Sequence, residues 1–344
     1  MAEKITEKLK LHLEFIKTHL TKVILGVSGA IVLFILIVFI ANSTFPSFFD
    51  PPTPPQPTPG WVFTSTVIDI GDQMFDNWLP NDLFWPTALM DNRPNFQLGE
   101  LMMLNYTVFR LKENLARLRS SDPIDSDCAE AYTLLSNDPL KWIFPSAESR
   151  FNKAMDYLKD YRQKLENNQA RFSPRADNLS ELLTQYVSLL GSLNYNLSRA
   201  PGELRLKQVA HPATSSISPP PTPAIPVPAS SNPASPIPGQ PELETNHVAS
   251  SEVDDNFYLA QGAAYVLRQM MAAIKVDFQE ILEVKKATEL VDDIILTLDQ
   301  SQFEPLIVLN GDIGSITANH SMELHSILEN TRQKINNLIV MISQ

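Results

Sequence analysis

The sequence predicts an all-α protein in which an N-terminal transmembrane helix is followed by a bundle of six or seven helices. Three observations lead to this prediction. One long segment near the N-terminus is apolar and carries no charge, and apolar residues elsewhere recur every three or four positions. No stretch shows the sustained alternation of apolar and polar residues that indicates a half-buried strand.

Residues 23–41 form the apolar segment. As a helix it would span roughly 28 Å, close to the hydrocarbon thickness of a bilayer. The segment is longer than the apolar part of an ordinary signal peptide, and 22 residues precede it. We therefore expect a retained anchor that contacts the lipid bilayer. The alternative is a cleavable signal peptide, which the small residues Ala41 and Ser43 would suit.

The distribution of basic residues predicts the orientation. Residues 1–22 contain five lysines, and no Lys or Arg follows the segment until Arg93. The positive-inside rule then makes residues 1–22 a cytoplasmic lead-in and places the rest of the chain across the membrane.

Two proline-rich stretches divide the remainder of the chain. Seven of the 27 prolines lie in 46–59 and twelve in 201–241. We interpret 42–60 as a spacer, in which the proline-rich stretch 46–59 could extend by up to about 45 Å, because polyproline II rises 3.1 Å per residue. We interpret 201–252 as a disordered linker.

Helical apolar stripes fill the regions on both sides of the linker, 61–200 and 253–344. In the first region the stripes run over 67–78, 101–118, 151–165 and 179–197, and in the second over 257–278, 281–298 and 324–342. Ser146 is placed to cap the 151–165 helix, and Ser173, followed by Pro174, is placed to cap the 179–197 helix. Because a striped helix must bury its apolar face, we expect the two blocks to pack into one domain. Two independent bundles are the alternative.

Composition and motifs exclude several functions. The net charge of −12 argues against a nucleic-acid partner, and the single cysteine excludes an intrachain disulfide and a cysteine-based zinc site. The chain has no P-loop, dinucleotide fingerprint, G-x-S-x-G or H-E-x-x-H motif. We therefore predict no catalytic residues, metal or cofactor. Cys128 is expected in a loop as a free or half-buried thiol, and Asp254 with Asp255 is expected to start a helix.

Two loops, 79–100 and 309–321, combine turn-forming residues with polar groups, as ligand sites do. If the loops meet, they would form one candidate polar cluster of Asp82, Asp91, Asn92, Asn310, Asp312, Asn319 and His320. The alternative is that both loops are ordered connectors, in which Asp and Asn cap helices and His320 bonds a neighbouring backbone group.

These loops and several helical stretches resemble a known family. The matching stretches are 81–100, 142–151, 171–179, 254–267, 276–287 and 309–321, for example WIFPSAESRF and DDNFYLAQGAAYVL. The chain is similar to the proteobacterial domain-of-unknown-function family 2333. The resemblance implies a single-pass protein of the Gram-negative inner membrane with its bulk in the periplasm, and it implies no activity. The proline-rich linker departs from the family pattern.

The sequence therefore predicts an envelope scaffold or protein-interaction module, with other envelope proteins as partners. A periplasmic ligand-binding or sensor domain is the alternative, and a carboxylate-based envelope hydrolase is a third hypothesis, which would need two carboxylates facing one cleft.

Overall fold

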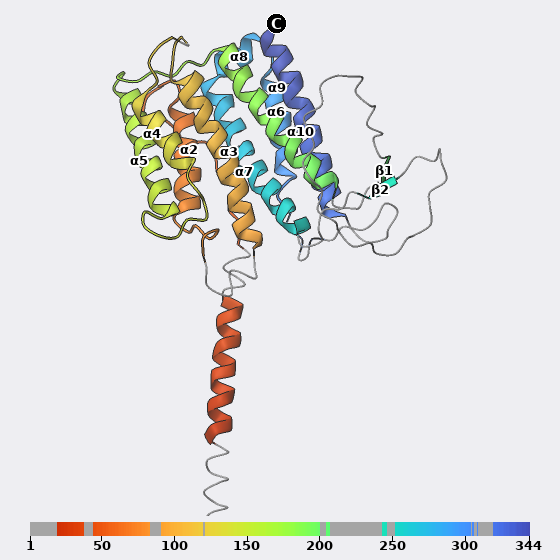
Figure 1. Cartoon of the computed structure of the whole chain (residues 1–344). Coiled ribbons are helices and arrows are strands. Elements are labelled where there is room, and N and C mark those ends of the chain that lie inside the picture. Colours follow the sequence, from red (N-terminus) through yellow and green to blue (C-terminus); the bar gives the residue numbers. More distant parts are fainter. Residues whose placement is uncertain are drawn as a thin grey trace, which may run out of the picture.

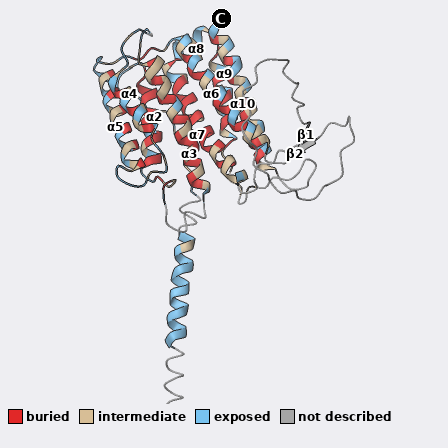
Figure 2. Ribbon diagram, viewed as in Figure 1, coloured by how far each residue is buried: buried red, intermediate tan, exposed pale blue. Residues whose placement is uncertain are grey.

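The computed structural model describes residues 19–37, 44–82, 91–119, 121–199, 252–303, 305, 308 and 319–344, and the backbone of 204–206 and 243–245. The first described helix, His19–Ile37, is long and apolar enough to cross a membrane. Its position near the N-terminus fits a membrane anchor or a signal sequence. Its residues are almost all exposed, whereas the helices of the bundle have buried inner faces (Figure 2).

The bundle is all-α, which confirms the predicted fold class. In chain order its α-helices are α2 (Trp61–Phe75), α3 (Asn92–Arg110), α4 (Ser126–Leu135), α5 (Ala147–Glu166), α6 (Ala176–Ser198), α7 (Val253–Asp277), α8 (Gln279–Val284), α9 (Thr288–Asp299) and α10 (His320–Ser343). A π-helical turn, Leu111–Leu115, continues α3. Two three-residue strands, β1 (Leu204–Leu206) and β2 (Leu243–Thr245), pair antiparallel within the predicted linker.

The central pair of the bundle is α3 and α7, one from each side of the linker (Figure 1). Helices α2, α4 and α5 pack on one side of this pair, and α6, α9 and α10 pack on the other. Helix α6 also packs along α10, so both blocks contribute to one continuous hydrophobic core.

Two glycines bring α3 and α7 close together. A Cβ atom on Gly99 would lie 2.0 Å from the carbonyl oxygen of Leu259, and one on Gly262 would lie 1.9 Å from that of Phe96. Each glycine therefore faces the backbone of the other helix, and no larger residue fits at this helix crossing.

Local sequence accounts for some helix boundaries and not for others. Ser146 caps α5 by accepting a hydrogen bond from the Ser149 N–H, as predicted. Helix α6 begins only at Ala176, so the predicted cap at Ser173 is wrong. The periodicity missed α4 because that helix is short, and it merged α8 with α9, which separate where Lys286 adopts a positive φ of 52°.

The proline-rich residues 44–60 lie along the bundle and do not hold it at a distance from the apolar helix. We call them the docked segment. Phe45 stacks on Tyr258 near the start of α7, and Phe48 stacks on Tyr265, which lies further along the same helix. The Gln269 side chain donates to the Phe49 carbonyl, and at the far end Asp277 accepts from the Gly60 N–H. The prediction of an extended spacer is wrong here, because the phenylalanines of this segment bury apolar surface against the bundle. The prolines have no N–H group, so they can lie along the bundle without leaving a donor unpaired.

Candidate functional site

The predicted polar cluster lies at the end of the bundle where α3, α7 and α10 begin, but its described members occupy three separate places. Asn310 and Asp312 lie outside the described residues. Asp82 is exposed after α2, and its pKa is raised, first by partial burial and then by the charge of Glu148. Asp91 and Asn92 stand at the start of α3, and Asn319 and His320 at the start of α10.

Asn319 and His320 have local partners. The Asn319 side chain accepts a hydrogen bond from the Met322 N–H at 3.0 Å and so caps α10. The His320 ring lies beside that of Phe303, with 6.2 Å between the ring centroids. The Asn319 cap matches the connector interpretation, in which Asn side chains of this loop cap helices.

Asp91 meets two carboxylates that are distant in sequence. One carboxylate oxygen each from Asp91, Asp254 and Asp255 lies within 4.8 Å of the others. The Asn95 side chain donates to Asp255 at 2.6 Å. Burial, and then the charges of Asp91 and Asp254, raise the pKa of Asp255 to about 6.

This carboxylate cluster has a structural explanation. It sits where α3 and α7 both begin, and helix N-termini stabilise negative charge. The sequence alone indicated only the helix start at Asp254 and Asp255. It gave no signal that Asp91, more than 160 positions earlier, would join them.

A charged pair lies deeper in the same end of the bundle. Arg93 Nη1 is 3.8 Å from Glu100 Oε2, and both side chains are buried. The Arg93 guanidinium also lies over the ring of Phe96, 5.1 Å from its centroid, and over that of Phe45, at 5.9 Å. Burial raises the pKa of Glu100 to about 7, although the Arg93 charge acts in the opposite direction.

Tyr265 links this pair to the docked segment. Its hydroxyl lies 3.0 Å from Gln73 Oε1 and 3.2 Å from the carbonyl oxygen of Ser47. Burial, followed by the charge of Glu100, raises the pKa of the Tyr265 phenol. The buried polar groups of α3 and α7 thus hold the start of the docked segment in place. In the sequence, Arg93 is noted only as the first basic residue after the apolar segment, and neither Glu100 nor Tyr265 is singled out.

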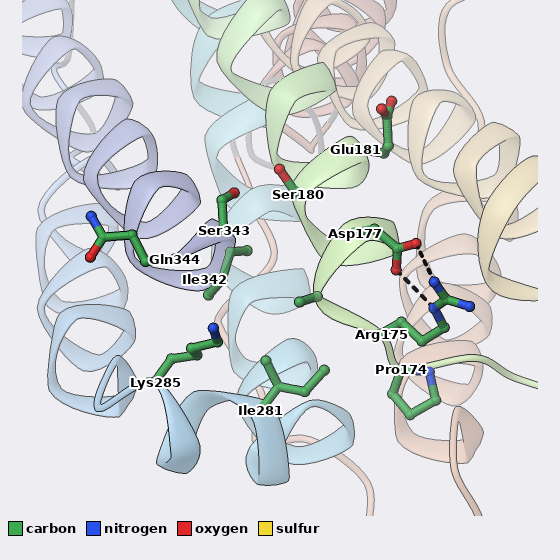
Figure 3. Close-up of a pocket in the computed structure, with 11 residues that line it drawn as sticks. Pro174, Arg175, Asp177, Ser180, Glu181, Ile281, Lys285, Ile342, Ser343 and Gln344 are labelled. Carbon is green, nitrogen blue, oxygen red and sulfur yellow. Dashed lines mark hydrogen bonds and ion pairs between the residues drawn. The ribbon is translucent and has the colours of Figure 1, made fainter.

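The opposite end of the bundle carries an open hollow of about 790 Å³ (Figure 3). It lies between the start of α6, α8 and the end of α10. Its charged side chains are Arg175, Asp177, Glu181 and Lys285, two of each sign. Arg175 and Asp177 form an ion pair of 2.7 Å within it. The mixed charge and the open, mainly polar wall suit a surface contact more than the capture of a small apolar ligand.

Cys128 lies in α4 and not in a loop, and its side chain is buried. Burial, and then the charges of Asp125 and Asp127, raise the pKa of its thiol. A reactive cysteine needs the opposite shift, because the thiolate is the nucleophile.

The fold and these sites define a class of protein: a helical bundle that follows one N-terminal apolar helix and holds the segment after that helix against its own core. The chain belongs to the family described as an uncharacterized protein conserved in bacteria (DUF2333), whose model matches residues 53–344. This match confirms the resemblance seen in the sequence. No curated protein and no solved structure shows a significant match to the chain.

Proposed function

We propose that this protein is a membrane-anchored interaction scaffold of the bacterial envelope, with residues 23–41 retained in the inner membrane and the bundle in the periplasm. The lysines of residues 1–22 support this orientation, since lysines are enriched on the cytoplasmic side of single spans. Other envelope proteins are the expected partners.

The observation that carries the proposal is the docking of residues 44–60. A flexible tether would leave the bundle free to rotate on its anchor. Here Phe45, Phe48 and Gly60 are held at successive points along α7. The docked segment therefore keeps the bundle within a few residues of the anchor, and we propose that this short connection limits how far the bundle can turn, as a scaffold needs in order to present the same faces to its partners.

The sides of the bundle offer surfaces for such partners. A groove of about 450 Å³ runs between α3 and α4, lined by Met102, Asn105, Tyr106, Phe109, Tyr132 and Ser136. Its aromatic and methionine side chains are of the kinds enriched at protein interfaces.

Topology is the first test. A C-terminal alkaline phosphatase fusion should be active, because that enzyme works only after export, and a C-terminal cytosolic reporter should be silent. The reverse pattern would contradict the periplasmic placement. A mature chain that begins near Thr44 would show a cleaved signal peptide and contradict the retained anchor.

Partner contact is the second test. A photo-crosslinking amino acid at Tyr106, in the groove, should give discrete protein adducts in cells. The same amino acid at Leu25, in the apolar helix, serves as a lipid-facing control. Undocking the segment with Phe48→Ala should weaken the Tyr106 adducts while the chain stays in the membrane fraction. Adducts that persist unchanged in Phe48→Ala would show that partner contact does not need the docked segment. If the wild-type chain gave no adducts at Tyr106, a scaffold that uses this groove would be contradicted.

A further inference from the structure

We propose that the loop between α4 and α5 is a second membrane contact, in which the apolar tip of this loop enters the lipid interface beside the anchor helix. The apolar tip consists of Leu140, Trp142, Ile143 and Phe144. The inference goes beyond the scaffold role but rests on the proposed anchoring of the chain in a bilayer.

The tip is unusually exposed for its composition. Leu140, Trp142 and Ile143 are 56%, 58% and 59% exposed, and Phe144 is 91% exposed. Four large apolar side chains therefore face outward within five consecutive residues, with only Lys141 among them. Scattered apolar residues are normal on a protein surface, but a contiguous group of this kind marks a contact with lipid or with another protein.

The tip belongs to the end of the bundle where α3 and α7 begin. The Trp78 indole N–H donates to the Pro139 carbonyl at 3.0 Å, and the Asn81 side chain donates to the Lys141 carbonyl at 3.1 Å. Next to Trp78, the Leu79 N–H donates to the side chain of Gln97 in the second turn of α3.

The same end of the bundle carries Phe45. Its ring lies 5.0 Å from that of Phe96, the neighbour of Gln97 in α3. Phe45 is only four residues beyond Ala41, the last residue of the apolar segment. Four residues reach at most about 14 Å. With residues 23–41 in the bilayer, this end of the bundle is therefore the end nearest the membrane, and Figure 1 shows the apolar helix on this side of the bundle.

The chemistry of the tip suits lipid. Trp is enriched at the membrane interface, and the long Lys141 side chain can keep its ammonium group in the headgroup layer. The loop also bonds its own backbone: the Ala147 N–H donates to the Lys141 carbonyl at 2.8 Å, and the Leu140 N–H donates to Asp138 at 3.0 Å. The loop can therefore enter the interface with these groups already paired. A peripheral contact of this kind, added to a spanning helix, would limit tilting of the bundle.

The test uses the full chain in phosphatidylcholine vesicles. An environment-sensitive fluorophore is attached to Phe144→Cys and, as a matched control, to Val284→Cys. Val284 is 75% exposed on α8, which follows the far end of α7. The wild-type chain, whose Cys128 is buried, gives the background labelling. Spin-labelled lipid should quench the fluorophore at position 144 at least twofold and leave that at position 284 unchanged.

Two further measurements separate the outcomes. Adding Trp142→Ser and Ile143→Ser to the Phe144→Cys chain should return quenching to the level of the Val284→Cys control, and undiminished quenching would overturn the proposal. Vesicle flotation reports the anchor independently. If the chain floats but the fluorophore at position 144 is not quenched, the tip does not contact lipid and is then expected to contact a protein. That result would overturn only this inference. A chain that fails to float would contradict the anchor itself and with it both proposals.

Discussion

At the scale of a single residue, the buried carboxyl group of Glu100 makes the stability of the bundle depend on pH. Its pKa in the folded chain is about 7, against an ordinary 4.5, because it is buried between α3 and α7. Between these two values the folded state holds a proton that the unfolded state has released. The contribution of Glu100 to the free energy of unfolding must therefore fall as pH rises from about 4.5 to about 7, and level off above that.

Replacing Glu100 by Gln removes this dependence. The stability of the Glu100→Gln variant relative to wild type should increase by at most about 3 kcal/mol between pH 4.5 and pH 7.5. Denaturant titrations of the detergent-solubilised full chain at several pH values would measure it. Asp277, with a pKa raised to about 6 by burial, provides the comparison: Asp277→Asn should leave the response between pH 6 and pH 7 intact. If the difference in unfolding free energy between Glu100→Gln and wild type did not change with pH, the argument that burial raises the pKa of Glu100 would be contradicted.

The crossing of α3 and α7 gives a prediction at the scale of the element. Because Gly99 and Gly262 each face the backbone of the other helix, an added methyl group can be accommodated only by moving the helices apart. We expect Gly99→Ala and Gly262→Ala each to lower the free energy of unfolding by about 1–3 kcal/mol. Chemical denaturation of the two variants and the wild type would measure this change.

Gly191 supplies the control for the helix crossing. It lies inside α6, and no atom outside the adjoining backbone of that helix stands within 4 Å of where its Cβ would be. There the substitution to Ala should raise stability by about 0.5–1 kcal/mol, since alanine favours the helix. If the variants at positions 99 and 262 were as stable as the one at 191, the close crossing would be wrong.

The docked segment is the second element with a testable energy. Phe48 stacks on Tyr265 and lies under the guanidinium of Arg268, 4.6 Å from its ring centroid. Phe48→Ala should lower the free energy of unfolding by about 1–3 kcal/mol and speed hydrogen exchange over residues 44–50. Ser47→Ala is the matched control, because Ser47 contributes only its backbone carbonyl to Tyr265. Equal exchange in the two variants would show that the segment is not held by Phe48.

At the scale of the whole molecule, the sequence predicts local patterns but not the contacts between residues that are far apart in the chain. The stripe from Leu101 to Leu118 predicts the second half of α3 because helical periodicity is a property of neighbours, and Ser146 predicts its cap for the same reason. The first half of α3, from Asn92, falls in the stretch 79–100, so the prediction of a loop there is wrong for residues 92–100. The cap of α2 comes instead from Asp277, more than 200 residues away, whose carboxylate accepts from the N–H groups of Gly60 and Phe63. The meeting of Asp91 with Asp254 and Asp255 is equally non-local. No spacing rule connects such residues, because the packing of α3 on α7 brings them together.

The last prediction concerns the linker, which lies between two blocks that share one core. Helices α3 and α6 precede it, and α7 and α10 follow it, yet α3 packs on α7 and α6 packs on α10. Replacing residues 215–239 by a protease site and cutting there should therefore leave both fragments associated under native, detergent-solubilised conditions. Before cutting, the thermal midpoint of the chain with this replacement should differ from that of the wild type by only a couple of degrees, since strands β1 and β2 and all the described helices lie outside the replaced stretch.

Size-exclusion chromatography and circular dichroism before and after cleavage would measure the association and the midpoint. Adding Gly262→Ala to the cut chain is an informative second arm. In the cut chain only non-covalent contacts hold the fragments together, and the α3–α7 crossing is one of them. Weakening this crossing should make the fragments separate at a lower denaturant concentration than those of the cut wild-type chain. Fragments that separate on cutting alone, each retaining its helicity, would show two independent bundles and contradict the shared core.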